Sequence, residues 1–319
     1  MRISLLFSAL CISFAFSQYS LKTEHIGGAR DAKGSNTFRA TLMKNGSPAA
    51  TVERRLPFDV PFPSVSVNEA TGIFILNYTF DGFVEVYSST GKKVWEEHFF
   101  KEKGPNYERT ITVALGNSSI AFLTSDVTLP TASVHRYTVN GRKEWETVMP
   151  HSMGYEIAMS KDERTIVAGS YFVLEDEVRR TAAVLNSEGT ITGTADILFR
   201  TAAFSDDGSV IALASEREIS LYSVLLQKET ARGAQAPTER IINGVLWQGD
   251  ELIVQESMIQ VTPDHQFYFV QPSFIRFDGK LRERSRTTLE HSRFKQSSMK
   301  AGTDGVTFRP DSGGTFLLR

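Results

Sequence analysis

Cysteine is nearly absent from this chain of 319 residues, and its one cysteine, Cys11, lies in an apolar segment at the N-terminus. The rest of the sequence therefore offers no disulfide, no thiolate nucleophile and no thiolate ligand for zinc, an iron–sulfur cluster or c-type haem. Histidine is also scarce, and none of the six histidines has the His-x-His or His-Glu-x-x-His spacing that places two ligands on one metal ion. We expect no cofactor and no metal, so stability must come from an apolar core.

The sequence also lacks an excess of charge of either sign. It has 35 basic and 37 acidic residues, and its formal net charge of -2 predicts no general affinity for nucleic acid or for an anionic membrane. A glycine-rich phosphate loop, a Gly-x-Ser-x-Gly elbow and an EF-hand calcium loop are missing as well. The charged run Glu175–Glu177, followed by Arg179 and Arg180, is typical of a solvated hairpin tip.

The N-terminus has the pattern of a secretory signal peptide. Arg2 precedes an apolar run from Ile3 to Phe16, and Ala15-Phe16-Ser17 matches a small-x-small cleavage site. The run has 14 residues, whereas a membrane-spanning helix needs about 20. We therefore expect residues 1–17 to be removed before Gln18, and the protein to be secreted, periplasmic or held at the cell surface without a transmembrane segment.

Two stretches of the chain repeat one pattern. "YSSTGKKVWEEHFF" begins at Tyr87 and "YTVNGRKEWETVMP" at Tyr137, and both place Tyr, Gly, a basic residue and Trp at the same spacing. Alternating apolar residues before the glycine and a short apolar run after it indicate a strand, a tight turn and a second strand. Related units surround Gly46, Gly189 and Gly279, and "ISLYSVLLQKET" is a copy without its glycine.

A second kind of turn interleaves with the first. Segments such as "IAMSKDERTIVAGSYF" and "AAFSDDGSVIALAS" place a polar turn before an aliphatic strand. These turns are marked by Gly72, Asn117, Glu163, Gly208, Asp250 and Gly313, at steps of 45, 46, 45, 42 and 63 residues. Such a period matches one four-stranded propeller blade, and few segments hold the apolar period of a helix. Because no linker divides residues 18–319, we predict an all-β fold, a single six-bladed β-propeller of four-stranded blades.

The two ends of the chain and one long interval carry further predictions. The chain opens with "TFRATLMKNG" and closes with "TFLLR", and we expect these two segments to pair, so that the ends share one blade and close the ring. The step of 63 contains "ELIVQESMIQV" and "QFYFVQPSFIRF", which predict two long strands joined by a turn at Thr262–His265. The alternative is that "VTPDHQFYFVQP" is itself a turn between a first and a second strand.

These motifs resemble known propeller repeats. "STGKKVW" is similar to the Thr-Gly-Lys-x-x-Trp signature of quinoprotein-like repeats, and "FSDDGSVIALAS" and "FRPDSGGTFLLR" resemble the Asp-Gly turns of WD40 and YVTN-type propellers. The resemblance covers almost all of residues 18–319, although only two of the six units carry the tryptophan. It implies that Trp95 and Trp145 pack between neighbouring blades. It does not imply quinoprotein catalysis, because those dehydrogenases carry an adjacent cysteine pair, and several a haem motif, that residues 18–319 do not supply.

A propeller gathers its binding loops on one face. There, the loops from one blade to the next lie beside the loops between second and third strands, and aromatic and arginine-rich loops on a rigid scaffold are typical of binding surfaces. The candidates on these loops are Tyr107, Glu108, Arg109, His151, Arg200, Arg240, His265, His291 and Arg293.

Two classes of function remain open. The favoured one is an exported, non-catalytic module that binds a protein, peptide or glycan, since no catalytic constellation appears beside a nearly complete repeat framework. The other is a hydrolase or lyase whose acid, base and cation site assemble at the channel mouth from loops of several blades, which the spacing of the sequence leaves open. The oligomeric state also stays open.

Overall fold

The computed structural model describes residues 18–26, 35–57, 61–101, 106–175, 177–233 and 236–318. The predicted signal peptide, its cleavage site and Cys11 lie outside these residues. The described residues are almost entirely strands and turns, as predicted, and their one helix is a single 3₁₀ turn, η1 (Thr79–Asp81). The chain divides into two compact units: residues 1–76 with 85–95, and residues 77–84 with 96–319.

The first unit contains a three-stranded antiparallel sheet in the order β1-β2-β3, formed by β1 (Tyr19–Ile26), β2 (Ser35–Lys44) and β3 (Ser47–Pro57). Phe38, Ala40 and Leu42 alternate along β2 and are buried, as the period of two in a strand requires. The side chain of Tyr19 is buried at the start of β1.

This sheet shows that the predicted pairing of the two chain ends is wrong. β2 contains most of "TFRATLMKNG" and has β1 on one side and β3 on the other, so both of its edges are occupied. The strand β27 (Phe316–Leu318) belongs instead to a sheet of order β25-β26-β27. The predicted strands begin at Thr37, and β1 gives a weak apolar signal: among its residues with described side chains, 19–24, Tyr19 is the one that is buried, and Leu21 is half-buried.

A four-stranded sheet follows, in the order β4-β5-β6-β7. It consists of β4 (Ser64–Val67), β5 (Phe74–Tyr78), β6 (Phe83–Tyr87) and β7 (Lys93–His98). All five residues of β5 are buried, whereas β7 alternates exposed and half-buried residues. The division between the two units crosses this sheet.

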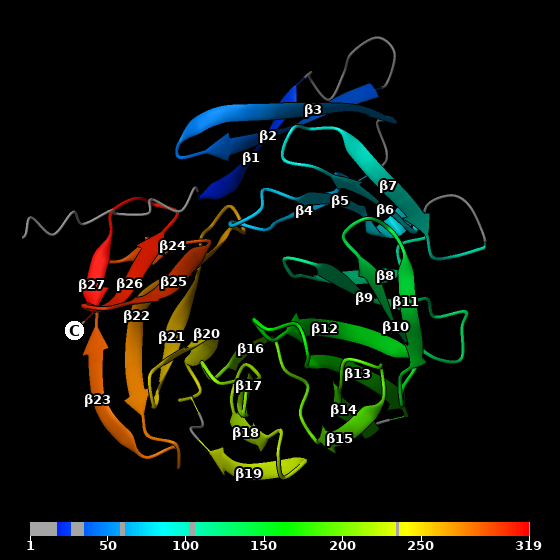
Figure 1. Cartoon of the computed structure of the whole chain (residues 1–319). Coiled ribbons are helices and arrows are strands. Elements are labelled where there is room, and N and C mark those ends of the chain that lie inside the picture. Colours follow the sequence, from blue (N-terminus) through cyan, green and yellow to red (C-terminus); the bar gives the residue numbers. More distant parts are fainter. Residues whose placement is uncertain are drawn as a thin grey trace, which may run out of the picture. The chain divides into compact units, whose positions relative to one another are not determined.

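In the second unit each sheet is built from consecutive strands, each antiparallel to its neighbours (Figure 1). The first sheet has β8 (Thr110–Leu115), β9 (Ser119–Ser125), β10 (Ser133–Thr138) and β11 (Lys143–Val148), and the second has β12 (Met153–Met159), β13 (Ile166–Leu174), β14 (Glu177–Leu185) and β15 (Ile191–Ala195). The third has β16 (Thr201–Phe204), β17 (Val210–Ala214), β18 (Ile219–Ser223) and β19 (Lys228–Gly233). Then come β20 (Arg240–Gln248), β21 (Glu251–Val261), β22 (Phe267–Phe277) and β23 (Glu283–Thr288), with β24 (Arg293–Phe294) beside β22, and last β25 (Ser297–Gly302), β26 (Gly305–Pro310) and β27.

The core of the second unit lies between successive sheets. Along β13, Ile166 and Ala168 pack against the preceding sheet, and Val167 between them packs against the following one. The same alternation joins the third sheet to the fourth and the fourth to the last. A strand buried on both faces reads as a continuous apolar run, which explains why the second and third strands of each sheet have the strongest apolar signal in the sequence.

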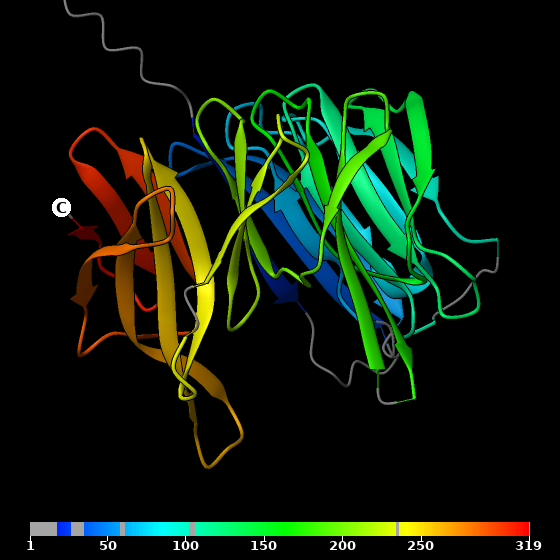
Figure 2. The ribbon, with the colours of Figure 1, turned by 90° about the horizontal axis from the view of Figure 1, so that it is seen from below.

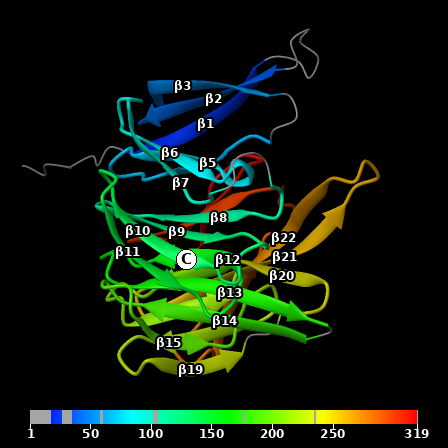
Figure 3. The same cartoon turned by 90° about the vertical axis from the view of Figure 1, so that its right-hand side faces the viewer.

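Two hairpins of the second unit are longer than the rest. β13 with β14, and β21 with β22, extend beyond their neighbouring strands on the same side of the unit (Figures 2 and 3). β21 and β22 pair from Leu252↔Phe277 to Val261↔Phe267 around a turn in which His265 N–H donates to Thr262 O. The predicted long hairpin with its turn at Thr262–His265 is therefore confirmed.

Candidate functional site

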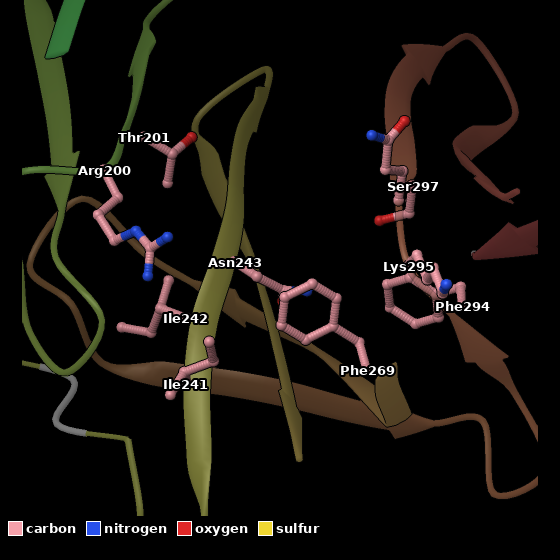
Figure 4. Close-up of a pocket in the computed structure, with 10 residues that line it drawn as sticks. Arg200, Thr201, Ile241, Ile242, Asn243, Phe269, Phe294, Lys295 and Ser297 are labelled. Carbon is pink, nitrogen blue, oxygen red and sulfur yellow. The ribbon is translucent and has the colours of Figure 1, made fainter. Parts of the chain in front are cut away.

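A hollow of about 390 Å³ lies beside two segments that connect successive sheets of the second unit, with Arg200 between β15 and β16 and Lys295 between β24 and β25 (Figure 4). We call it the central hollow. Its described lining residues are Arg200, Thr201, Ile241, Ile242, Asn243, Phe269, Phe294, Lys295, Gln296 and Ser297. Arg200 and Ile242 lie on one side of β20, whereas Asn243 and Phe269 lie on the other side and face Phe294. The lining of the hollow thus combines apolar side chains, which we call its floor, with two cations, Arg200 and Lys295.

Two further hollows adjoin the central one. The first, of about 430 Å³, shares Arg200 with it and is also lined by Tyr155, Arg180 and the β17–β18 turn. The second, of about 470 Å³, shares Phe294 and Lys295 and is also lined by Tyr268 and Arg293. Because neighbouring hollows share side chains, the three lie in a row, which we call the loop-side groove.

Arg200 separates two of the hollows and is held in place by an acid. Its Nη1 donates to Oε1 of Glu216, which follows the end of β17. Beside it, burial raises the pKa of the Tyr155 phenol and of the Glu156 carboxyl. Glu156 Oε1 accepts the backbone N–H of Ile157 at 3.0 Å. The guanidinium of Arg200 is therefore paired with Glu216 while about half of its side chain stays exposed.

The other end of the groove has two cations stacked on one aromatic ring. The guanidinium of Arg293 lies 3.7 Å from the centroid of the Tyr268 ring, and Lys295 Nζ lies 5.0 Å from it. Lys295 Nζ also donates to Gln266 Oε1 at 2.8 Å. Stacking of cations on a ring is favourable by about 0.5 to 2 kcal/mol, so this end of the groove holds two ordered cations, with one carboxylate, Asp311, in the same lining.

Arg240, a predicted binding residue, lies inside the sheet and not on the groove surface. Its side chain is 12% exposed, and its Nε lies 3.2 Å from Oε1 of the buried Glu256. Its Nη2 donates to the hydroxyl of Ser273 at 2.8 Å. Arg286 donates to the same carboxylate from β23. This network fixes β20 to β23 against one another, so Arg240 orders the strands that carry the groove.

Arg109 also lies in the interior. Its side chain is 2% exposed and pairs with Asp126, so it offers no charge to a ligand. Tyr107 and Glu108 precede it and are exposed, with the Tyr107 ring against Phe80 at a centroid distance of 5.1 Å. A separate hollow of about 300 Å³ lies here, lined by Phe99, Phe100, Lys101, Arg109, Asp126, Thr128 and Leu129. None of these residues lines the loop-side groove.

The three candidate histidines lie in three different places. His151 is half-buried, and its Nε2 lies 3.0 Å from the hydroxyl of Thr181. His265 is exposed at the turn of the long hairpin, in the left-handed backbone region at φ 59°. His291 is exposed between β23 and β24. Within the described residues, no group of three or more His, Cys, Asp or Glu side chains is arranged to hold a metal ion.

Trp145 contacts the sheet that follows its own. Its Nε1 donates to the carbonyl oxygen of Ser187 at 2.8 Å, and its ring lies against Gly189 in the β14–β15 turn. A Cβ added at Gly189 would come within 2.7 Å of the indole. Trp95 is half-buried on β7.

Sequence reasoning found two cations of the groove, Arg200 and Arg293, but missed Phe269, Phe294 and Lys295. The two phenylalanines lie in apolar runs that predict core packing, so nothing in the pattern marks them as hollow-lining residues. Lys295 lies between β24 and β25, and a lone surface lysine carries no signal. These residues meet only because β24 pairs with β22, at Phe269↔Phe294.

Comparison with known proteins identifies the fold. No protein-family model and no curated protein sequence matches the chain. Among solved structures, it is similar to a chain of hydrazine synthase from Kuenenia stuttgartiensis, with a TM-score of 0.53 and 12% identity over 80% of this chain and 75% of that one. In the part of the chain that the structure describes, no helix is long and apolar enough to cross a membrane. At this level of identity the likeness shows the fold alone, a β-propeller-like succession of antiparallel sheets, most of them four-stranded.

Proposed function

We propose that this chain is an exported, non-catalytic binding module of the quinoprotein-like or WD40-like repeat type, and that its ligand is a peptide segment of another protein. The observation that carries the proposal is that the three hollows of the loop-side groove adjoin one another, since Arg200, Phe294 and Lys295 each line two of them. A row of connected hollows suits an extended ligand, whereas a small-molecule site is usually a single concave pocket.

The lining supports binding over catalysis. Arginine and aromatic residues are enriched where proteins bind each other, and the groove has Arg200, Arg293, Tyr155, Tyr268 and the ring of Phe294. The described residues that line the central hollow include no carboxylate and no histidine, so Lys295 is the one side chain of this lining that commonly serves in general acid–base catalysis, and it has no acid–base partner there. A peptide is favoured over a glycan because the floor is aliphatic as well as aromatic, with Ile241 and Ile242 beneath Arg200.

Panning of a random-peptide phage library on residues 18–319 tests this function. Peptides that bind the groove should lose at least about tenfold in affinity when Arg200 is replaced, because arginine is enriched among the few interface residues whose truncation is costly, and a tenfold loss corresponds to about 1.4 kcal/mol. Arg164→Ala is the matched control, because Arg164 is an exposed arginine in the β12–β13 turn and lines none of the three hollows. Failure to enrich any peptide, or equal binding to Arg200→Ala and wild type, contradicts the proposal.

Export is tested separately by mass spectrometry of the protein from its native source. A chain that begins at Gln18, with its N-terminal glutamine free or cyclised, is expected. An intact Met1 on the mature protein would contradict export by a cleaved signal peptide.

A further inference from the structure

The outer part of the β21–β22 hairpin has one wholly apolar face. Ile259 pairs with Phe269 and Val261 pairs with Phe267, and directly opposed residues of an antiparallel pair project to the same side of the sheet. Ile259, Val261 and Phe267 are 45%, 53% and 66% exposed. Large apolar side chains exposed together on one rigid face are typical of an interaction surface.

Phe269 joins this face to the central hollow. Its ring lines the hollow and lies 5.6 Å from the ring of Phe294. In Figure 4, Phe269 projects from the hairpin toward the space between Arg200 and Phe294. The apolar strip of Ile259, Val261, Phe267 and Phe269 therefore runs from the hairpin tip into the groove, where Arg200 and Lys295 supply positive charge.

The same stretch of β21 extends past the end of its neighbouring strand. Pairing of β20 with β21 ends at Arg240↔Met258, and residues Ile259–Val261 continue beyond it. The backbone N–H and C=O groups on that edge of β21 are a template for one more strand. Addition of an extended peptide to such an edge is a common mode of recognition, in which alternate side chains fill pockets on the sheet face.

The other long hairpin lacks this arrangement. It also exposes apolar side chains, Phe172, Val173, Leu174 and Val178, but Phe172 pairs with Arg179 and Leu174 with Glu177. Phe172 and Leu174 therefore share their face with charged residues, whereas Val173 and Val178 oppose each other and form a single apolar pair. None of these hairpin-tip residues lines a hollow of the groove, so exposure of apolar side chains alone does not single out the β21–β22 hairpin.

We propose that an extended, apolar and acidic segment of a partner protein adds as a strand to β21 at Ile259–Val261, packs its side chains on the apolar strip and places a carboxylate between Arg200 and Lys295. This rests on the proposed peptide-binding function and specifies where and how the peptide binds. The acidic character follows from Arg200 and Lys295 in the hollow and from Arg293 stacked on Tyr268 beside it. Selected peptides should accordingly alternate apolar residues and carry aspartate or glutamate near one end.

The test uses a fluorescent synthetic copy of a peptide selected from the phage library, titrated against residues 18–319. Phe267→Ser should weaken binding at least about tenfold, and because the ring is largely exposed the variant should fold normally. Phe172→Ser is the matched control, since it removes an exposed phenylalanine from the other long hairpin, and it should bind as wild type does. Hydrogen exchange of the Ile259–Val261 amides should slow when the peptide binds, because strand addition protects them.

The outcomes separate this inference from the function on which it rests. If Arg200→Ala weakens binding and Phe267→Ser does not, or if exchange at Ile259–Val261 is unchanged, the inference is overturned and the binding function stands. If neither variant weakens binding, both are overturned. Equal losses in Phe267→Ser and Phe172→Ser indicate unspecific adsorption, and retention on phosphatidylglycerol vesicles that Phe267→Ser abolishes indicates a membrane ligand; each overturns the peptide site.

Discussion

The Nε of Arg109 donates to Oδ2 of Asp126 across 2.9 Å, and both side chains are buried, 2% and 4% exposed. Arg109 precedes β8 and Asp126 follows β9, so this ion pair joins the ends of two paired strands. Burial opposes ionisation of Asp126, but hydrogen bonds from Thr128 and Arg109 outweigh it and hold the pKa of the carboxyl below its usual value.

Asp126→Asn should destabilise the protein by about 3 to 5 kcal/mol, because removing one partner of a buried pair leaves the other charge uncompensated. Chemical denaturation of residues 18–319 measures this loss. Glu177→Gln is the control, since it breaks the exposed pair with Arg179, for which about 0 to 1 kcal/mol is expected. Equal losses in the two variants would show that burial of the Arg109–Asp126 pair has no energetic consequence.

Glu163 should be essential to the junction of two sheets. Its Oε1 accepts the N–H groups of Asn117 and Ser118, and its Oε2 accepts the hydroxyls of Ser118 and Ser119. We expect Glu163→Gln to lower the free energy of unfolding by about 1.5 to 3 kcal/mol, since bonds to a charged acceptor are lost.

A glycine variant at Glu163 compares the cost of the backbone conformation with the gain from the hydrogen bonds of the carboxylate. Its φ of 62° is in the left-handed region, which costs a non-glycine residue about 1 to 2 kcal/mol. Glu163→Gly relieves this strain and yet should also lower the melting temperature, because the four hydrogen bonds outweigh it. Glu188→Gln, at an exposed turn, should leave the melting temperature unchanged. A more stable Glu163→Gly variant would mean that the hydrogen bonds contribute less than the strain.

Gly189→Ala should destabilise the protein far more than Gly208→Ala. Both glycines have positive φ, 82° and 71°, so both variants carry backbone strain of about 1 to 2 kcal/mol. Only at Gly189 would the new methyl group meet a side chain, the indole of Trp145, because nothing lies within 4 Å at Gly208. Melting temperatures measured side by side separate the two effects, and equal shifts would contradict the packing role of Trp145.

His135 should make stability depend on pH. It is buried on β10 beside Phe99, with Nε2 2.9 Å from the Thr124 hydroxyl, and it faces Glu146 and Lys143. Burial lowers its pKa to about 4, despite the opposing effect of Glu146. The unfolded chain binds this proton near pH 6.5, so stability is full above that pH and falls as the pH drops from about 6.5 to about 4.

Denaturation midpoints at pH 7 and pH 4.5 measure this effect. The loss of stability between the two pH values should be smaller in His135→Gln than in wild type, by up to a few kcal/mol. His265→Gln, at an exposed turn, should keep the wild-type difference. Identical pH dependence in wild type and His135→Gln would show that another group is responsible.

The all-β fold and the strand boundaries around the glycine turns were predictable because local chemistry decides them. Gly189 needs positive φ, and alternation along β13 follows from burial on both faces. The same reasoning located the copy without its glycine, where Gln227 adopts a φ of 52° at the turn between β18 and β19. The long β21–β22 hairpin was predictable from the single interval that exceeds the repeat.

The pairing of the chain ends and much of the candidate site were not predictable, since both depend on contacts between distant residues. The sequence of β1 has no pattern that predicts its pairing with the edge of β2. Arg109 and Arg240 look like loop arginines until Asp126 and Glu256 are placed beside them. Conversely, the apolar run around Phe269 predicts a core residue. The pairing of Phe269 with Ile259 shows instead that it lies on the same face of the hairpin as the exposed side chains Val261 and Phe267.

The hydrogen bonds from Ser118 to Glu163 and the packing of Trp145 on Gly189 join neighbouring sheets and are not contacts within one sheet. In a repeat protein each repeat contacts only its neighbours, and stability is approximately the sum of the stabilities of the repeats and of the junctions between them. Here a duplicated second sheet would bring one Glu163 that meets no Ser118 and one Gly189 that meets no tryptophan, so the new junctions would begin without their specific contacts. An added sheet would therefore contribute less junction stability than the present sheets do until compensating substitutions arise in its neighbours.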